Sequence, residues 1–311
     1  METIQRCLID WCGFTFLDSS MKDLPLECFN LLRSWTGENI SMEKGGRKNF
    51  YENTFDVFAY RGSEAILIAH VSHGGESQKG RANVQINGTG CSTIRDWQPV
   101  VEFLDSLDDS RLTRVDIACD FLKGEISVDE FQEFYEQGHF NKNGRPPSHN
   151  VHGCWFKIEQ GTGRTLEVGK RKNGMMFRAY EKGRQLGNPD SPWVRAECEF
   201  HNVDRELLSE MLISPDQYFA GAYPCLEAIV YYGATRIMTE KKSGETSLEK
   251  LLKHLHDSYG KAIHVATESI YFEKQDELIE KLRQLGVPKR LKRAALQMLP
   301  EDFSPRPLAT G

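Results

Sequence analysis

Three apolar segments of the sequence carry charged or hydroxylated side chains at every second residue. They are TRVDIACD at 113–120, MMFRAYEK at 175–182 and WVRAECEF at 193–200. Alternate residues of a β-strand point to opposite faces, so each segment, as a strand, places its polar side chains on one face. The three polar sets are Arg114, Asp116 and Asp120; Arg178, Tyr180 and Lys182; and Arg195, Glu197 and Glu199. Taken one strand at a time, a solvated sheet face with cross-strand ion pairs explains the same pattern.

The spacing of the acids favours a site over a solvated face. An arginine stands two residues before an acid twice, Arg114 before Asp116 and Arg195 before Glu197, and the small Ala118 leaves room beside the acids. Two or three convergent carboxylates form a hard, oxygen-rich site that suits Mg²⁺ or Mn²⁺. The pattern therefore predicts a divalent metal ion on this face.

A tyrosine among cations indicates phosphoryl transfer. Free tyrosine has a pKa near 10, so only about one part in a thousand is ionised at pH 7. Arg178, Lys182 and a bound metal ion are expected to lower the pKa of Tyr180 by favouring the phenolate. Attack by tyrosine on a phosphodiester conserves the bond as a phosphotyrosine ester, and the strand can later be rejoined. This chemistry suits DNA replication or transfer better than degradation.

The elements that must position these residues form an α+β domain, an antiparallel β-sheet with flanking helices. The sequence shows no internal repeat. Asn173-Gly174 is typical of a hairpin turn, and Gly74-Gly75 indicates a second one. Strands are predicted at 7–16, 54–60, 65–71, 82–86, 113–121, 153–158, 165–169, 175–182 and 193–200, and helices at 20–35, 95–107 and 127–137.

The pattern turns helical after about residue 240, with leucines at helical spacing and a break at Gly286-Val-Pro288 before a basic helix at 289–299. We therefore divide the chain into a catalytic domain at 1–235, a helical C-terminal segment at 236–300 and a loose tail at 301–311. His254-Leu255-His256 resembles a two-histidine metal motif. It lies in a helical stretch, where residues two apart point about 200° from each other, so we reject it as a metal site.

Composition permits DNA binding without requiring it. The 311 residues are 39% hydrophobic and 27% charged, with a net charge of −6 that does not by itself favour a nucleic-acid partner. Residues 164–184 are nonetheless strongly basic, and a local groove can attract DNA while the whole chain is acidic. This stretch predicts DNA contacts by Lys170, Arg171, Lys172 and Arg184.

Cysteine spacing and hydropathy bear on location. The eight cysteines form no CxxC pair, so zinc-ligand spacing is absent. No apolar run is long enough to span a bilayer, and the N-terminus lacks a secretion signal. We expect a cytoplasmic protein without a membrane partner.

Five motifs in order carry a family resemblance: Asp10-Trp11 with Thr15, Gly88-Thr89-Gly90-Cys91, TRVDIACD, FRAYEKGRQLG at 177–187 and WVRAECEF. Together they resemble the replication initiation factor family over residues 5–235. Its members include plasmid initiators, filamentous-phage replication proteins and nicking relaxases. The resemblance implies a rolling-circle initiator in a bacterial host that nicks one strand at an origin and stays attached to the 5′ end through tyrosine.

The resemblance also implies roles for single residues. Tyr180 would be the nucleophile, assisted by Arg178 and Lys182. Asp116 and Glu197 would bind Mg²⁺ or Mn²⁺, with Asp120 and Glu199 as further ligands, and Arg114 and Arg195 would contact phosphate or orient the acids. The implied partners are single-stranded or melted origin DNA and a host helicase, and a homodimer remains open.

Three alternatives remain open. A DNA-binding regulator would keep the fold without nicking, although an intact Tyr180 argues against it. A relaxase for conjugative transfer would use the same chemistry. A hydrolytic nuclease would activate water and leave Tyr180 structural.

Overall fold

The computed structural model describes residues 7–46, 50–107, 109–142, 145–155, 163–203, 205–230 and 248–283. The chain forms two compact units, residues 1–241 and 242–311. The predicted domain boundary at 235, the basic helix at 289–299 and the tail at 301–311 lie outside the described residues.

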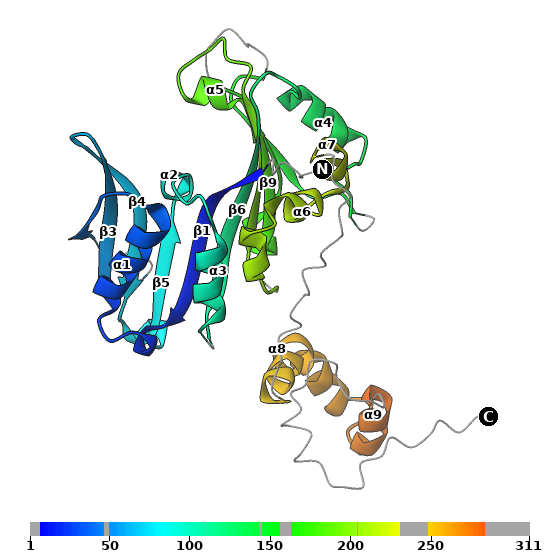
Figure 1. The fold of residues 1–311 in the computed structure, drawn as a ribbon. Coiled ribbons are helices and arrows are strands. Elements are labelled where there is room, and N and C mark those ends of the chain that lie inside the picture. Colours follow the sequence, from blue (N-terminus) through cyan, green and yellow to red (C-terminus); the bar gives the residue numbers. More distant parts are fainter. Residues whose placement is uncertain are drawn as a thin grey trace. The chain divides into compact units, whose positions relative to one another are not determined.

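The first unit is built on one antiparallel sheet (Figure 1), to which the described residues contribute ten strands in the order β2-β3-β4-β5-β1-β6-β10-β9-β8-β7. The strands are β1 (Cys7–Leu17), β2 (Ile40–Lys44), β3 (Asn53–Arg61), β4 (Glu64–His73), β5 (Arg81–Ile86), β6 (Arg111–Phe121), β7 (His149–His152), β8 (Thr165–Lys170), β9 (Met175–Tyr180) and β10 (Val194–His201). The prediction of an α+β fold on an antiparallel sheet is confirmed.

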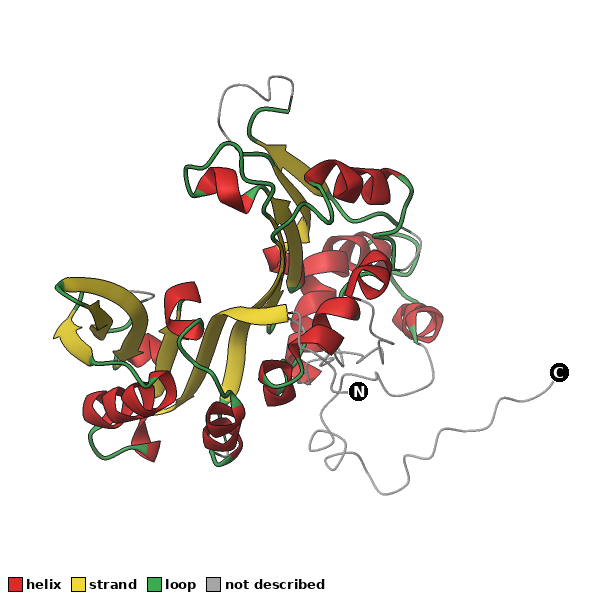
Figure 2. Ribbon diagram, turned by 45° about the horizontal axis from the view of Figure 1, so that its top comes forward, coloured by secondary structure: helices red, strands yellow, loops and turns green. Residues whose placement is uncertain are grey.

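Most helices of this unit cover one face of the sheet. They are α1 (Leu24–Thr36), α2 (Gly88–Cys91), α3 (Gln98–Asp105), α4 (Val128–Glu136), α5 (Lys182–Gln185), α6 (Pro215–Ala220) and α7 (Pro224–Val230). Figure 2 shows α1, α3, α4, α6 and α7 on the convex side of the curved sheet, and the short α2 and α5 on the concave side. We call the side that carries α2 and α5 the concave face.

The alternation read from the sequence explains why the convex face is the core. Val115 and Ile117 of β6 and Phe177 of β9 are fully buried, and Phe177 packs against Phe131 of α4 with ring centroids 5.3 Å apart. Apolar side chains at every second strand residue thus meet the helices. The intervening polar side chains therefore point to the concave face.

The sheet consists of two halves with the same connectivity, β1-α1-β2-β3-β4-β5 and β6-α4-β7-β8-β9-β10. We call them the N-half and the C-half. The two halves are related by a pseudo-two-fold axis that passes between the paired residues Cys12 of β1 and Val115 of β6. Rotation about this axis places the pair Leu8–Ala118 on the pair Arg111–Thr15. Both central strands shift register at matching places, between Ile9 and Trp11 and opposite the step from Gly13 to Phe14. The repeat is one of topology, since the sequences of the two halves show none.

The predicted strands correspond to elements of the structure with two exceptions. β2 was not predicted, and the strand expected at 153–158 is wrong in position, because β7 ends at His152 and a bend follows. Residues 156–158 lie outside the described residues. The turn predicted at Asn173-Gly174 is confirmed: Gly174 has a φ of 80°, which a residue without a Cβ adopts at little steric cost.

The second unit contains α8 (Leu248–Thr267) and α9 (Gln275–Leu282) among its described residues. The helical interpretation of His254-Leu255-His256 is confirmed, because both histidines belong to α8. None of the helices in the described ranges combines the length and the hydropathy needed to cross a membrane.

Candidate active site

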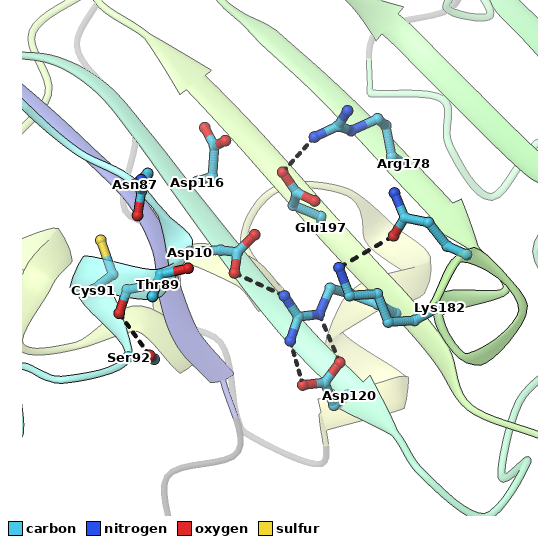
Figure 3. Close-up of polar contacts among 12 residues, drawn as sticks. Asp10, Asn87, Thr89, Cys91, Ser92, Asp116, Asp120, Arg178, Lys182 and Glu197 are labelled. Carbon is cyan, nitrogen blue, oxygen red and sulfur yellow. Dashed lines mark hydrogen bonds and ion pairs between the residues drawn. The ribbon is translucent and has the colours of Figure 1, made fainter. Parts of the chain in front are cut away.

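The strand register of the C-half gathers the predicted residues on the concave face (Figure 3). Arg195 of β10 lies opposite Asp120 of β6 on one side and opposite Tyr180 of β9 on the other. One step along β10, Glu197 lies opposite Ala118 and Arg178, and Glu199 lies opposite Asp116 one step further. Residues from segments far apart in the sequence therefore share one surface.

Tyr180 lies within hydrogen-bonding reach of a carboxylate. Its hydroxyl donates to Oε2 of Glu197 at 3.3 Å, and Nη2 of Arg178 donates to Oε1 of the same residue at 2.6 Å. The Glu197 side chain is only 2% exposed. The structure thus brings Tyr180, Arg178 and Glu197 together on one face, which is the arrangement that the proposed chemistry requires.

Lys182 reaches the tyrosine by a different route from the predicted one. β9 ends at Tyr180 and Lys182 begins α5, so the prediction that both residues lie on one strand is wrong. The turn into the helix nevertheless places Nζ of Lys182 5.5 Å from the centroid of the Tyr180 ring. The same amine donates to Oε1 of Gln185 at 3.1 Å.

A cavity of about 380 Å³ opens beside the tyrosine. It is lined by Asp10, His152, Gly163, Arg164, Thr165, Glu167, Arg178, Tyr180, Glu181, Gln185 and Glu197. Tyr180, Arg178 and Glu197 all border this space. A ligand in the cavity would meet the hydroxyl and both charges directly.

Asp10 belongs to this site although the sequence assigned it no chemical role. Counted back from the core residues Cys12, Phe14 and Phe16, strict alternation would place Asp10 in the core, but the register shift between Ile9 and Trp11 turns it toward the concave face. Its Oδ1 accepts from Nη1 of Arg195 at 2.7 Å. Gly88 of α2 lies so close that a Cβ there would be 2.9 Å from this oxygen. Only the family motif Asp10-Trp11 pointed to this residue.

Each remaining acid of the predicted metal set is paired with an arginine. Arg114 donates to both carboxylate oxygens of Asp116, at 2.8 and 2.5 Å. Arg195 donates to both oxygens of Asp120, each at 2.7 Å, and Trp193 donates to one of them.

Glu199 is bound differently. Its Oε1 lies 2.6 Å from Nε2 of His201 and accepts from Nε of Arg171 at 2.8 Å, while Oε2 is buried without a hydrogen-bond partner among the described residues.

The residues predicted to bind DNA occupy different environments. Lys170 and Lys172 are exposed at the turn between β8 and β9. Arg171 is half exposed and pairs with Glu199, and Nε of Arg184 lies 3.9 Å from Oε2 of Glu181. Lys170 and Lys172 are therefore the side chains of this set best placed to meet a phosphate backbone.

Arg178 and Lys182 do not by themselves lower the pKa of Tyr180, and the contribution expected from a bound metal ion stays a prediction. Burial raises the pKa of Tyr180 above its ordinary value, and the negative charges of Glu197 and Asp10 raise it further, against opposing contributions from Arg195 and Arg178. Burial and the nearby Arg195 lower the pKa of Lys182. The protein's own charges therefore do not activate the tyrosine, because burial and two carboxylates outweigh the arginines.

The acids of this face repel one another. Burial raises the pKa of Asp116 and that of Asp10, and in both cases the charge of Glu197 adds to the effect while an arginine opposes it. Three carboxylates from three neighbouring strands are thus close enough to interact. Such a cluster gains from a bound cation.

The donor chemistry fits a hard divalent ion, with one reservation about the ion pairs. Within the described ranges no three Asp, Glu, His or Cys side chains are clustered closely enough to hold a metal as they stand. Asp10, Asp116 and Glu197 supply carboxylate oxygens around Ala118, which is the type of ligand that Mg²⁺ and Mn²⁺ prefer. Each of the three is already bonded to an arginine. A metal ion would therefore compete with the arginines for the negative charge of these acids.

The comparison with known families includes the half of the sheet that holds this site. The sequence matches the replication initiation factor family over residues 110–282, which is more than half of the chain. The class is therefore that of DNA replication factors, and the chain belongs to the replication initiation factor family, as its motifs predicted. Among solved structures, a rolling circle replication initiator protein from Geobacillus stearothermophilus is similar over 63% of this chain and 74% of that chain, at 19% identity and a TM-score of 0.43. No curated protein sequence matches the chain closely enough to count as a relative.

Proposed function

We propose that this chain initiates rolling-circle replication by nicking one strand of origin DNA and later rejoining it, with Tyr180 as the nucleophile. The observation that carries the proposal is the hydrogen bond from the Tyr180 hydroxyl to Glu197 at the edge of the cavity. Membership of the replication initiation factor family supports it.

The nicking step needs a proton acceptor, because the raised pKa of Tyr180 keeps the phenol neutral at pH 7. In our proposal the Tyr180 oxygen attacks phosphorus while its proton passes to Oε2 of Glu197, which acts as a general base. The bond from phosphorus to O3′ breaks, its electron pair stays on O3′, and the Lys182 ammonium supplies the proton. The lowered pKa of Lys182 suits this donation. Attack by the 3′ hydroxyl reverses the step and rejoins the strand.

Charge on the phosphate is neutralised by the arginines of the face, and a bound metal ion would add to this effect. Arg178 borders the cavity beside Tyr180, and Lys170 and Lys172 would hold the backbone further along. Asp10, Asp116 and Glu197 would hold Mg²⁺ or Mn²⁺, which when bound stabilises charge on the phosphate oxygens and favours the phenolate. Origin DNA in single-stranded or melted form is the proposed substrate. A helicase partner and a homodimer stay predictions.

A covalent-adduct assay tests the proposal. The protein is incubated with Mn²⁺ and labelled DNA of the replicon that encodes it, then denatured. We expect a protein–DNA adduct that disappears in Tyr180→Phe and in EDTA. Tyr60→Phe is the matched control, because Tyr60 lies on β3 of the N-half, 37% exposed and bonded to Ser41, and this variant should keep the adduct.

The other outcomes identify the alternatives. Cleavage that persists in Tyr180→Phe without an adduct would show a hydrolytic nuclease. DNA binding without cleavage in any metal would show a regulator. Either result would refute tyrosine attack.

A further inference from the structure

Two ion pairs occupy the floor of the candidate site. Asp116 is 3% exposed and bonded to Arg114 through both oxygens, and Glu197 is 2% exposed and bonded to Arg178. The two carboxylates have little access to water, so each depends on its guanidinium for charge compensation. A metal ion at either acid would compete with the guanidinium for the negative charge, most directly at Asp116, because Arg114 bonds both of its oxygens whereas Arg178 bonds only Oε1 of Glu197.

The arginines are more open than the acids they hold. The side chains of Arg114 and Arg178 are 29% and 27% exposed, and Arg178 borders the cavity. Nε of Arg178 is buried and has no hydrogen-bond partner among the described residues, so the exposed part of the guanidinium is its outer end. A partly exposed guanidinium beside a cavity suits the forked recognition of phosphate.

The N-half has the same topology as the C-half, but it lacks the first of these ion pairs. The pseudo-two-fold axis exchanges the pair Gly13–Arg114 with the pair Asp116–Trp11, so Gly13 stands in the place of Asp116 and Trp11 in the place of Arg114. Both charged members of the ion pair are thus replaced by uncharged residues.

The second ion pair has a counterpart of the same kind. Cys12 pairs with Ile86 as its counterpart Val115 pairs with Phe200, which makes β5 the counterpart of β10. Asn83 lies three residues before Ile86, as Glu197 lies three residues before Phe200. Asn83 pairs with Ser72 as Glu197 pairs with Arg178, so Asn83 and Ser72 occupy the places of the acid and the arginine. Acid and arginine are again absent together.

There is a physical reason why the N-half lacks both members of each ion pair. A buried charge that loses its only partner is strongly destabilising, whereas replacing both partners is tolerated. The N-half folds with the same register and neither pair, so the fold does not require them. Each pair therefore behaves as one unit that belongs to the chemistry of the C-half.

We propose that these two ion pairs couple metal binding to DNA binding. In the DNA-free protein the arginines hold the acids; when DNA phosphates bind Arg114 and Arg178, Asp116 and Glu197 are released to the divalent cation. Two carboxylate–guanidinium contacts are exchanged for carboxylate–cation and guanidinium–phosphate contacts, so no buried charge is left alone. Cation and DNA then bind more tightly together than either does by itself. The proposal rests on the proposed function for the place of both ligands.

The coupling is measured in a Tyr180→Phe chain, which cannot form the adduct. Mn²⁺ binding is followed by electron paramagnetic resonance and binding of fluorescent oligothymidylate by anisotropy. We expect each ligand to tighten the other about tenfold or more, by the same factor in both directions, because linkage is reciprocal. A factor of one in both titrations would overturn the proposal.

Two variants in that background probe the pair Arg178–Glu197 from opposite sides. Arg178→Gln frees the acid, so Mn²⁺ should bind more tightly without DNA and the coupling factor should fall. Glu197→Gln frees the arginine, so oligothymidylate should bind more tightly in EDTA. The control Arg111→Gln removes an arginine that is 56% exposed and paired with Asp109, and it should change neither affinity.

Weaker Mn²⁺ binding in Arg178→Gln, or weaker DNA binding in EDTA for Glu197→Gln, contradicts the exchange. If one variant fails to fold, as judged by thermal unfolding, the other decides. Adduct formation with a coupling factor of one removes the exchange and leaves the proposed function. Coupling without an adduct removes the proposed function and leaves the exchange. Failure to bind oligothymidylate with or without Mn²⁺ removes the exchange, and the adduct assay on origin DNA then decides the proposed function by itself.

Discussion

Arg164 binds Glu181, the residue that follows the proposed nucleophile Tyr180. Of the substitutions near the site, the loss of the Arg164 side chain has the effect that the structure defines best. Its Nε and Nη2 donate to Oε1 of Glu181 at 3.3 and 3.1 Å, and its backbone N–H donates to Oε2 at 2.8 Å. Nη1 donates to Asp129 at 2.6 Å, and the guanidinium lies 5.4 Å from the ring centroid of Trp155. Arg164 is the first residue of the basic stretch 164–184, and the structure shows it nearly buried.

The expected magnitude follows from the exposures. The side chains of Arg164 and Glu181 are 10% and 12% exposed, so Arg164→Met leaves a nearly buried carboxylate without its main partner. Breaking such a pair costs about 3–5 kcal/mol. Asp129 is 56% exposed and stays hydrated, so it adds little. We take the lower end, about 3 kcal/mol, which for a unit of this size lowers Tm by about 6–12 °C.

Tryptophan fluorescence is the appropriate assay, because all five tryptophans lie between residues 11 and 193 and report only the first unit. The control is Arg111→Met, whose exposed pair with Asp109 is worth about 1 kcal/mol or less. Adduct formation should also fall in Arg164→Met, since Glu181 adjoins Tyr180. Equal shifts of Tm in the two variants would refute the reasoning.

Two further predictions concern titration and thiol reactivity. Burial acts to raise the pKa of Glu199, but hydrogen bonds from His201 and Arg171 outweigh it and lower the pKa from 4.5 to about 2. This depressed pKa gives about 3 kcal/mol of stability that is present above about pH 4.5 and lost as the pH falls toward 2. In urea unfolding, Glu199→Gln should therefore lose less stability than the parent between pH 5 and 3, and parallel pH profiles would contradict this. Among the eight cysteines only Cys154 is partly exposed, so iodoacetamide at pH 8 should label one thiol rapidly in the folded chain and all eight in urea; a second fast thiol would disprove it.

The two errors in strand prediction have a common cause. β2 and β7 are the two edges of the sheet, and an edge strand buries few side chains. All four residues of β7 are exposed, and the C-terminal residues of β2, Glu43 and Lys44, are exposed as well. Alternation between polar and apolar residues arises because one face of a strand is buried. At the edges of the sheet fewer residues are buried, so the alternation that predicts a strand is weaker there. The central strands β6 and β10 were predicted correctly because most of their residues are buried, which makes the alternation clear.

The candidate site was predictable as a set of faces, though its pairings were not. Alternation alone places Arg178, Tyr180 and Glu197 on the polar sides of their strands. Which acid meets which arginine depends on register between strands distant in the sequence, and Asp10 reaches the site only through a bulge. Neither feature has a local sequence signal.

The sequence misjudged how the protein's own groups shift the pKa of Tyr180, for a related reason. The sequence shows the cations Arg178 and Lys182 beside the tyrosine, but it does not show how deeply the ring is buried or that two carboxylates lie near it. Both effects raise the pKa of Tyr180. Neighbours in sequence therefore indicate the sign of a pKa shift poorly when the largest contribution is burial.

One charged residue is kept in both halves, and it separates structural from chemical roles. Arg81 stands on β5 where Arg195 stands on β10, five residues before the paired counterparts Ile86 and Phe200. Each arginine bridges to a neighbouring strand or its approach: Arg81 bonds Thr15 and Asp109, and Arg195 bonds Asp120 and Asp10. A residue needed for catalysis alone would have no reason to persist in a half that lacks Tyr180, Glu197 and Asp116 counterparts. We therefore assign Arg195 chiefly to holding the strands in register, and the ion pairs Arg114–Asp116 and Arg178–Glu197, which only the C-half possesses, to the reaction.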